Sequence, residues 1–217
     1  GKSTIGRLVT RAWDLGGTPH DRGAVRLGGV DVRDLTLAAV RRRVAVVTQD
    51  VELFRASVRD NVTLFGARPA DDDRLRDVLA QVGLGDWLAA LPDGLDTPLA
   101  GSDGLSAGEA QLLAFARAFL ADPAVVVLDE PSSRLDRATE RRVEAATEAL
   151  LAGRTAIVIA HRLATLDRMD EIAVLEGGRV VEHGRREDLA RSPTSRYARL
   201  RRAGAPAAAD PLEEVAP

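Results

Sequence analysis

An unbroken apolar run that ends in two carboxylates limits the fold of this chain more than any other feature. Residues 124–128 read AVVVL, and Asp129, Glu130 and Pro131 follow directly. A strand that is apolar at every position is typical of a parallel sheet covered by helices on both faces. Such open α/β sheets bind ligands just outside the carboxyl ends of their strands. The run therefore predicts an α/β fold with Asp129 and Glu130 at the ligand-binding edge.

Two more apolar runs, residues 44–47 and 155–159, have the same character. Gln49 comes two residues after the first run, and His161 comes two residues after the second. In isolation Gln49 would be an ordinary loop residue and His161 a structural histidine. The Gln49 amide oxygen can also ligate a hard cation, and its NH₂ group can hold a water. For His161, its place at a strand end beside two carboxylates favours a functional role.

The chain begins Gly1-Lys2-Ser3-Thr4 and continues with a short helical pattern. These four residues match the end of the phosphate-binding pattern G-x-x-x-x-G-K-[ST], in which backbone N–H groups, the lysine ammonium and the hydroxyl hold phosphates and Mg²⁺. Lys2 is the only lysine in a chain whose other basic residues are all arginine. A start without Met suggests a fragment whose upstream portion is absent. Alone, the tetrapeptide fits a frayed terminus equally well.

Helical patterns separate the apolar runs. After the acidic triplet at residues 71–73, apolar residues recur on one face through residue 84, and Trp87 and Leu91 are expected in the core of this helical lobe. Ser106 and Glu109 fit the capping box S-x-x-E at the start of an apolar helix. The triplet is expected to be a solvated helix N-terminus, not a metal site.

The rest of the chain predicts smaller elements. A helix is expected over residues 138–151, a hairpin with strands at 172–175 and 179–182, and short helices near 186–190 and 195–202. Beyond residue 202 the Ala/Pro/acidic tail is expected to be disordered. The predicted divisions are a first core part at 1–50, a helical subdomain at 51–121, a second core part at 122–202 and the tail at 203–217.

Composition excludes several classes of protein. The chain has 30 basic and 33 acidic residues, so its formal net charge is −3. It therefore lacks the excess of positive charge that is typical of proteins that bind nucleic acid. Zero cysteines exclude a disulfide framework and a thiolate metal site. Aromatic residues make up 3% of a chain that is 45% hydrophobic, so the core must be aliphatic. No apolar run approaches the roughly 20 residues that span a bilayer.

Taken together in order, the motifs resemble the nucleotide-binding domain of an ABC (ATP-binding cassette) transporter from Gly1 to about Arg202. GKST is similar to the end of Walker A, VVTQD to the Q-loop, LSAGEAQ to the LSGGQ signature, VVVLDE to Walker B, SRLD to the D-loop and IAHR to the H-loop. The string LFRASVRDNV resembles exporter-type members, whose transmembrane domain precedes the ATPase. The fold implied is a P-loop NTPase (RecA-like) core sheet with an inserted helical subdomain, the N-terminal β-subdomain being partly missing.

The resemblance also implies ATP and Mg²⁺ as cofactors and a role for each motif residue. Glu130 would be the general base, Gln49 would sense Mg²⁺ and the attacking water, and His161 would hold the γ-phosphate. Ser106, Gly108 and Asp136 would face the nucleotide of a second cassette in a head-to-tail dimer. The remaining implied contacts are phosphate or nucleotide binding by Gly1, Lys2, Ser3, Thr4, Gln49 and Asp129, with Ser3, Gln49 and Asp129 as the Mg²⁺ ligands.

The implied protein is a transport ATPase. The resemblance places it at the cytoplasmic face of the cell membrane, as a soluble domain of a membrane protein. Its implied partner is a transmembrane domain, and no nucleic acid is implied. Ala107 and Glu109 depart from the usual signature, and Glu109 would add negative charge near a phosphate. Because most of the phosphate loop would lie before Gly1, we expect this piece alone to bind ATP poorly and barely hydrolyse it. A soluble ABC ATPase of translation or DNA repair, or an inactive cassette fragment, remains the alternative.

Overall fold

The computed structural model describes residues 2–15, 23–48, 50–101, 105–129, 137–160 and 163–204. The predictions made for Gly1, Gln49, Glu130, Asp136 and His161, and for the tail from residue 205, lie outside these residues. The chain forms two compact units, Ser3–Ile159 and Gly1–Lys2 with Ala160–Pro217. Each unit is described by itself, and the domain boundaries expected at residues 50, 121 and 202 stay predictions.

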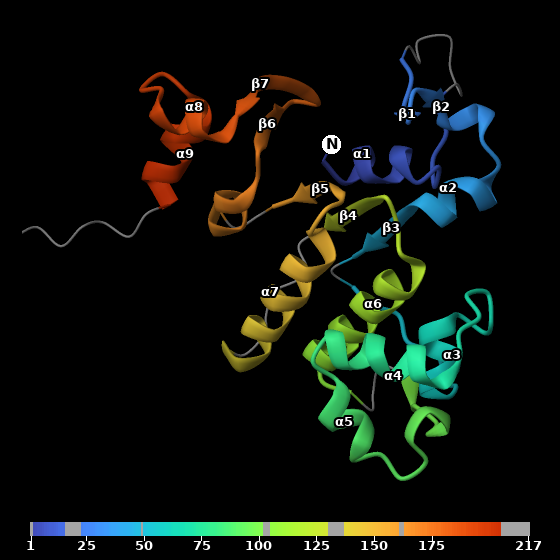
Figure 1. Ribbon diagram of the computed structural model, residues 1–217. Coiled ribbons are helices and arrows are strands. Elements are labelled where there is room, and N and C mark those ends of the chain that lie inside the picture. Colours follow the sequence, from blue (N-terminus) through green and yellow to red (C-terminus); the bar gives the residue numbers. More distant parts are fainter. Residues whose placement is uncertain are drawn as a thin grey trace, which may run out of the picture. The chain divides into compact units, whose positions relative to one another are not determined.

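The larger unit is built on a three-stranded parallel sheet. Its strands are β3 (Val44–Val47), β4 (Val125–Asp129) and β5 (Thr155–Ile159), in the order β3-β4-β5 (Figure 1). In register, Val125 of β4 lies between Val44 of β3 and Thr155 of β5. The three strands lie within one residue of the three apolar runs, and the predicted parallel α/β sheet is confirmed.

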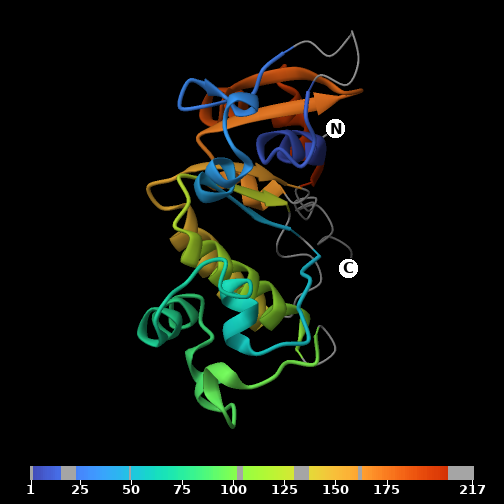
Figure 2. The same ribbon diagram turned by 90° about the vertical axis from the view of Figure 1, so that its right-hand side faces the viewer.

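Helices cover both faces of this sheet. Figures 1 and 2 show α1 (Lys2–Val9) and α2 (Leu37–Arg43) on one side, and α6 (Ala107–Ala121) and α7 (Arg137–Leu151) on the other. Alternate strand residues divide between two clusters, as the pleat requires. One cluster joins the strands to α1 and α2 and contains Val9, Val40, Val44 and Val127. The other joins Ala45, Val47, Val126 and Leu128 to α6 and α7.

A short hairpin connects the first two helices. It consists of β1 (Arg26–Leu27) and β2 (Val30–Asp31), which pair antiparallel and lead into the short helix η1 (Val32–Asp34). Asp31 caps η1 and binds the Arg33 guanidinium, and this hydrogen bond lowers the pKa of Asp31 to about 2. Each of the two strands is only two residues long.

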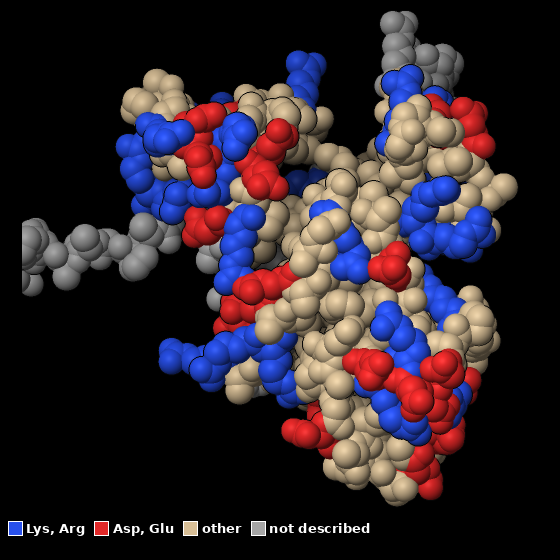
Figure 3. All heavy atoms as spheres, in the orientation of Figure 1, with Lys and Arg blue, Asp and Glu red and all other residues tan. Residues whose placement is uncertain are grey.

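The helical lobe lies between β3 and α6 in the chain. It contains α3 (Val58–Thr63), α4 (Asp72–Gln81), α5 (Gly85–Ala89) and the short helix η2 (Gly94–Asp96). Asp71 caps α4, and Asp72 forms an ion pair with Arg59, so the acidic triplet does begin a helix as predicted. Figure 3 shows acidic and basic side chains intermixed over α4.

One expectation for the core of this lobe needs correction. Trp87 and Leu91 are only partly buried and pack at the edge of the core, whereas Leu88 is 8% exposed. The helix α5 is only five residues long and has no long apolar stripe. The face that it turns to the core is therefore set by the buried residues Leu84 and Leu88.

The helix α6 links the lobe to the sheet. Leu112, Leu113 and Phe115 are fully buried, and α6 contacts α3, α4, α7 and β3. A helix enclosed on most sides is apolar almost all round. This explains why its sequence shows little amphipathic contrast, although the predicted helix and its capping box are both present.

A buried polar cluster holds α3 against α6. Asn61 is fully buried, accepts a hydrogen bond from Phe54 N at 2.8 Å and donates to Phe54 O at 3.0 Å. Arg117 donates from Nε to Asn61 O at 2.8 Å and from Nη2 to Asn61 Oδ1 at 3.2 Å. Burial of the guanidinium, and then the nearby charge of Arg68, lower the pKa of Arg117. The cluster satisfies polar groups that could not otherwise be buried at this junction.

The smaller unit contains a hairpin and three short helices. They are η4 (Leu163–Arg168), β6 (Glu171–Glu176), β7 (Arg179–Arg185), α8 (Arg186–Arg191) and α9 (Arg196–Gly204). The predicted hairpin and both predicted helices are present. Glu182 accepts hydrogen bonds from the backbone N–H groups of Arg196 and Tyr197 and so caps α9. Among the described residues, no helix is both long and apolar enough to cross a membrane.

We predict that Asn61→Ala lowers the free energy of unfolding by about 2–3 kcal/mol, because the Phe54 N–H and Arg117 Nη2 both lose the Asn61 Oδ1 acceptor in a largely enclosed cluster. Urea denaturation of the 217-residue chain measures the change. The exposed α4 residue Gln81 provides the control, since Gln81→Ala should shift stability by less than about 0.5 kcal/mol. Equal effects of the two substitutions would contradict the role given to the cluster.

Candidate nucleotide-binding site

The direction of α1 is fixed by what each end packs against. Val9, the last residue of α1, clusters with Val44, the first residue of β3. Nearer the start of α1, a Cβ on Gly6 would lie 3.2 Å from Val127 Cγ1 and 3.7 Å from Cδ1 of Ile159, the last residue of β5. The helix therefore runs against the strand direction, and its first turn points to the carboxyl edge of the sheet.

That first turn carries the predicted phosphate-binding residues. Lys2 is the first residue of α1, Lys2 and Ser3 are exposed, and Thr4 is half-buried. Ser3 precedes Gly6 by three positions and therefore shares the helix face that Gly6 turns to the sheet. The open N–H groups of a first helical turn attract anions. The sequence thus places an ammonium and two hydroxyls at the end of α1 suited to a phosphate.

Asp129 lies at the same edge of the sheet. It is the last residue of the central strand β4, pairs in register with Ile159 and is half-buried. Because Gly6 contacts Ile159 and Ser3 is one turn closer to the helix start, Ser3 and Asp129 both lie at the carboxyl edge of the strands. A carboxylate and a hydroxyl are oxygen donors of the kind that Mg²⁺ prefers. These residues therefore fit the expected Mg²⁺ and nucleotide phosphates.

The loop after β3 is tied to α6. The Gln111 side chain is 4% exposed and donates from Nε2 to Thr48 O at 3.2 Å. The Thr48 hydroxyl donates to Asp50 O at 2.8 Å. The structure therefore holds both neighbours of Gln49 in place at the end of β3. The sequence did not reveal this contact of Gln111, because a glutamine early in an apolar helix carries no distinctive pattern.

The start of α6 forms the predicted capping box. Glu109 N donates to Ser106 Oγ at 3.2 Å, while Ser106 N and Ser106 Oγ both donate to Glu109 Oε2 at 2.9 Å. The carboxylate of Glu109 is thus turned toward its own helix. The single hydroxyl proton of Ser106 already has an acceptor within the chain, so donation to another anion requires release of Glu109.

Ser106 and Gly108 differ in their surroundings. Ser106 is exposed, whereas Gly108, two residues later, is buried against α7. The described site candidates of the larger unit thus fall into two groups. Ser3, Thr4 and Asp129 belong to the carboxyl edge of the sheet, and Ser106 and Gly108 belong to the first turn of α6.

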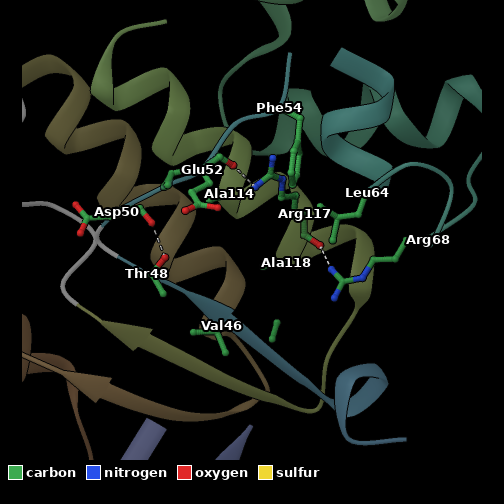
Figure 4. Close-up of a pocket in the computed structure, with 12 residues that line it drawn as sticks. Val46, Thr48, Asp50, Glu52, Phe54, Leu64, Arg68, Ala114, Arg117 and Ala118 are labelled. Carbon is green, nitrogen blue, oxygen red and sulfur yellow. Dashed lines mark hydrogen bonds between the residues drawn. The ribbon is translucent and has the colours of Figure 1, made fainter. Parts of the chain in front are cut away.

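A pocket of about 490 Å³ lies next to the loop that follows β3. Figure 4 shows Arg117 beside the ring of Phe54, with Thr48, Asp50 and Glu52 along one wall. Arg117 Nη1 donates to Glu52 O at 2.9 Å, and Arg68 Nη1 donates to Arg117 O at 2.7 Å. The pocket therefore connects the flanks of Gln49 to the polar cluster that joins α3 and α6.

Comparison with known proteins gives consistent matches. The family described as ABC transporter matches residues 1–133. An ATP-dependent lipid A-core flippase from Thiobacillus denitrificans is 44% identical over 202 residues, which cover 92% of this chain and 34% of the flippase. The mycobactin import ATP-binding/permease protein IrtA of Mycolicibacterium smegmatis is 44% identical over 190 residues, covering 87% of this chain and 21% of IrtA.

Solved structures agree with these relatives. A bacterial Atm1-family ABC exporter with ATP bound superimposes with a TM-score of 0.82 at 33% sequence identity, covering 97% of this chain and 36% of that chain. The chain therefore spans about a third of the length of that exporter and of the flippase. The fold expected from the sequence, with its parallel core sheet, matches that of this exporter.

We predict that Glu109→Ala lowers the free energy of unfolding by about 1 kcal/mol, because the Ser106 N–H and hydroxyl lose their acceptor. Glu109→Gln should remain within about 0.5 kcal/mol of the parent, since an amide oxygen can also close the capping box. Thermal unfolding of the three chains at neutral pH measures the difference. If the Ala and Gln variants unfold at the same temperature, the capping box does not stabilise α6.

Proposed function

This chain belongs to the ABC transporter family, and we propose that it is the ATP-binding and ATP-hydrolysing module of an exporter-type transporter. The observation that carries the proposal is the meeting of two elements at one edge of the sheet. The first turn of α1 points to the carboxyl edge, and the central strand β4 ends there in Asp129. Phosphoryl transfer depends on positioning and charge neutralisation, and this edge supplies groups for both.

Within one chain, we propose the following division of roles. Lys2 neutralises the β- and γ-phosphates, Ser3 and Asp129 hold the metal, and Thr4 lies by the α- and β-phosphates. Mg²⁺, when bound, neutralises phosphate charge. Glu130 follows Asp129 directly and accepts the proton of the attacking water. Gln49 and His161 each come two residues after a strand that pairs with β4. We propose that Gln49 contacts the attacking water and that His161 contacts the γ-phosphate.

We further propose that Ser106, Gly108 and Asp136 serve the nucleotide of a second cassette, in a head-to-tail dimer that closes on ATP. Support comes from the exposure of Ser106 at the first turn of α6, where open N–H groups favour an anion. The Glu109 carboxylate opposes this contact by its charge and by holding the Ser106 proton. ATP binding then favours the closed dimer and hydrolysis releases it, a population shift between two forms.

The partner that makes use of this cycle is proposed to be a transmembrane domain, with the module at the cytoplasmic face of the membrane. Its support is the nature of the relatives, which include a flippase and a protein named ATP-binding/permease, and of whose lengths the matched segments cover 34% and 21%. Export is favoured by the LFRASVRDNV string and by the similarity to an Atm1-family exporter. The transported substrate is set by the transmembrane part.

We predict that Glu130→Gln in the full-length protein lowers ATP turnover at least about 100-fold while ATP binding is retained, because the general base is lost and the phosphate contacts are not. Turnover and nucleotide affinity are measured on the purified protein in lipid vesicles. The exposed α7 residue Glu144 is the matched control, and Glu144→Gln should change neither quantity. Unchanged hydrolysis by Glu130→Gln would remove Glu130 from the catalytic role.

We also predict that the 217-residue chain tested by itself binds ATP at least about tenfold more weakly than the full-length protein. The chain holds only the last four residues of the phosphate-binding pattern, so the remaining backbone N–H groups of that loop cannot contribute. Isothermal titration with ATP and Mg²⁺, together with turnover at saturating ATP, compares the two proteins. Equal affinity and equal turnover would overturn this prediction.

A further inference from the structure

The helices α6 and α7 are in close contact at Gly108. This residue is the second of α6 and is buried. A Cβ placed on Gly108 would lie 2.0 Å from Thr139 Cγ2, 3.2 Å from Thr139 Cβ and 3.4 Å from Thr139 Oγ1. Carbon atoms in favourable contact are about 3.5–4.0 Å apart, so the methyl group of Thr139 occupies the space that any side chain at position 108 would need.

Thr139 is not free to move out of the way. It is the third residue of α7, a helix anchored by the buried residues Val143, Ala146 and Leu150. Arg142 Nη2 also donates to Gly83 O at 2.6 Å, which fixes the same end of α7 to the helical lobe. The side chain of Thr139 is β-branched and therefore has few χ1 rotamers in a helix. With Thr139 restrained in this way, relief of an overlap at position 108 is expected from a shift of α6 relative to α7.

We propose that Thr139 is a positioning residue of the nucleotide site, whose γ-methyl group packs on Gly108 Cα and sets the position of the first turn of α6. Glycine is then required at position 108 by a contact within the chain, in addition to any approach of a phosphate. The inference rests on the proposed function, because the position of α6 affects ATP turnover only if the first turn of α6 contacts a nucleotide.

The contact has a consequence for how the two nucleotides of a dimer are connected. The helix α7 begins at Arg137, directly after the segment that carries Glu130 and Asp136. Under the proposed function, Glu130 serves the nucleotide of its own chain and the first turn of α6 serves that of the partner. The packing of Thr139 on Gly108 therefore connects α7, which follows the residues that serve the chain's own nucleotide, to the first turn of α6, which serves the nucleotide of the partner.

A compensating pair of substitutions separates this role from a direct need for glycine at the phosphate. Thr139→Ser removes Cγ2, the atom at 2.0 Å, and keeps the hydroxyl together with whatever it bonds. The remaining Thr139 atoms, at 3.2 and 3.4 Å, are tight but tolerable neighbours for a methyl group. A Gly108→Ala/Thr139→Ser double variant should therefore restore the position of α6 although position 108 still carries a side chain.

The experiment uses the full-length protein in lipid vesicles, at a temperature where circular dichroism shows every variant to be folded. Gly108→Ala should raise the ATP concentration at half-maximal turnover at least about tenfold, since overpacking displaces the first turn of α6. The double variant should return to within about threefold of Thr139→Ser. Gly85→Ala is the matched control, because a Cβ at Gly85 meets Ala80 at an ordinary 3.6 Å, and it should leave turnover unchanged.

Two results would overturn the positioning role of Thr139. One is a double variant as impaired as Gly108→Ala, which would mean that the nucleotide itself requires glycine. The other is a Gly108→Ala variant that turns over ATP like the parent. Failure of the proposed function looks different, because the parent protein would then hydrolyse no ATP. The second result includes a merely structural role, in which Gly108→Ala lowers the unfolding temperature without changing the KM for ATP.

Discussion

The burial of β4 on both faces is the constraint on which the rest of the larger unit depends. Val126, Val127 and Leu128 are at most 1% exposed, with Val127 facing α1 and α2 and its two neighbours facing α6 and α7. A strand enclosed in this way needs partners on both edges and helices on both faces. Its first polar residue, Asp129, can then lie only at the edge of the sheet, where the first turn of α1 is also directed.

The helix α6 carries most of the remaining organisation. At its start, the capping box fixes the first turn and Gly108 packs against α7. Further along, Gln111 holds the loop after β3, and Arg117 binds the backbone of α3. The helix α6 thus contacts both the loop before Gln49 and the helical lobe. Its own first turn is the part proposed to contact the nucleotide of a second cassette.

This arrangement fits a module that responds to ATP and does not merely bind it. Under the proposed function, each chain contributes Lys2, Ser3 and Asp129 to one nucleotide and the first turn of α6 to another. The Glu109 carboxylate and the Ser106 hydroxyl are bonded to each other, so contact with a phosphate replaces an existing interaction within the chain. Such an exchange makes closure depend on the nucleotide, because in its absence the Ser106 hydroxyl and the Glu109 carboxylate already satisfy each other.

The sequence by itself determined the elements that local patterns define. The strands β3 and β5, the capping box of Ser106 and the β6–β7 hairpin lie where apolar runs and turn residues predicted them, because strand burial, capping and turns depend on neighbours in the chain. Only the tertiary structure decided that Leu88 and not Trp87 fills the lobe, that Arg117 bonds Asn61 56 residues away, and that Thr139 leaves room for glycine alone at position 108. These contacts depend on how whole helices are placed against one another, and periodicity within each helix does not encode that placement.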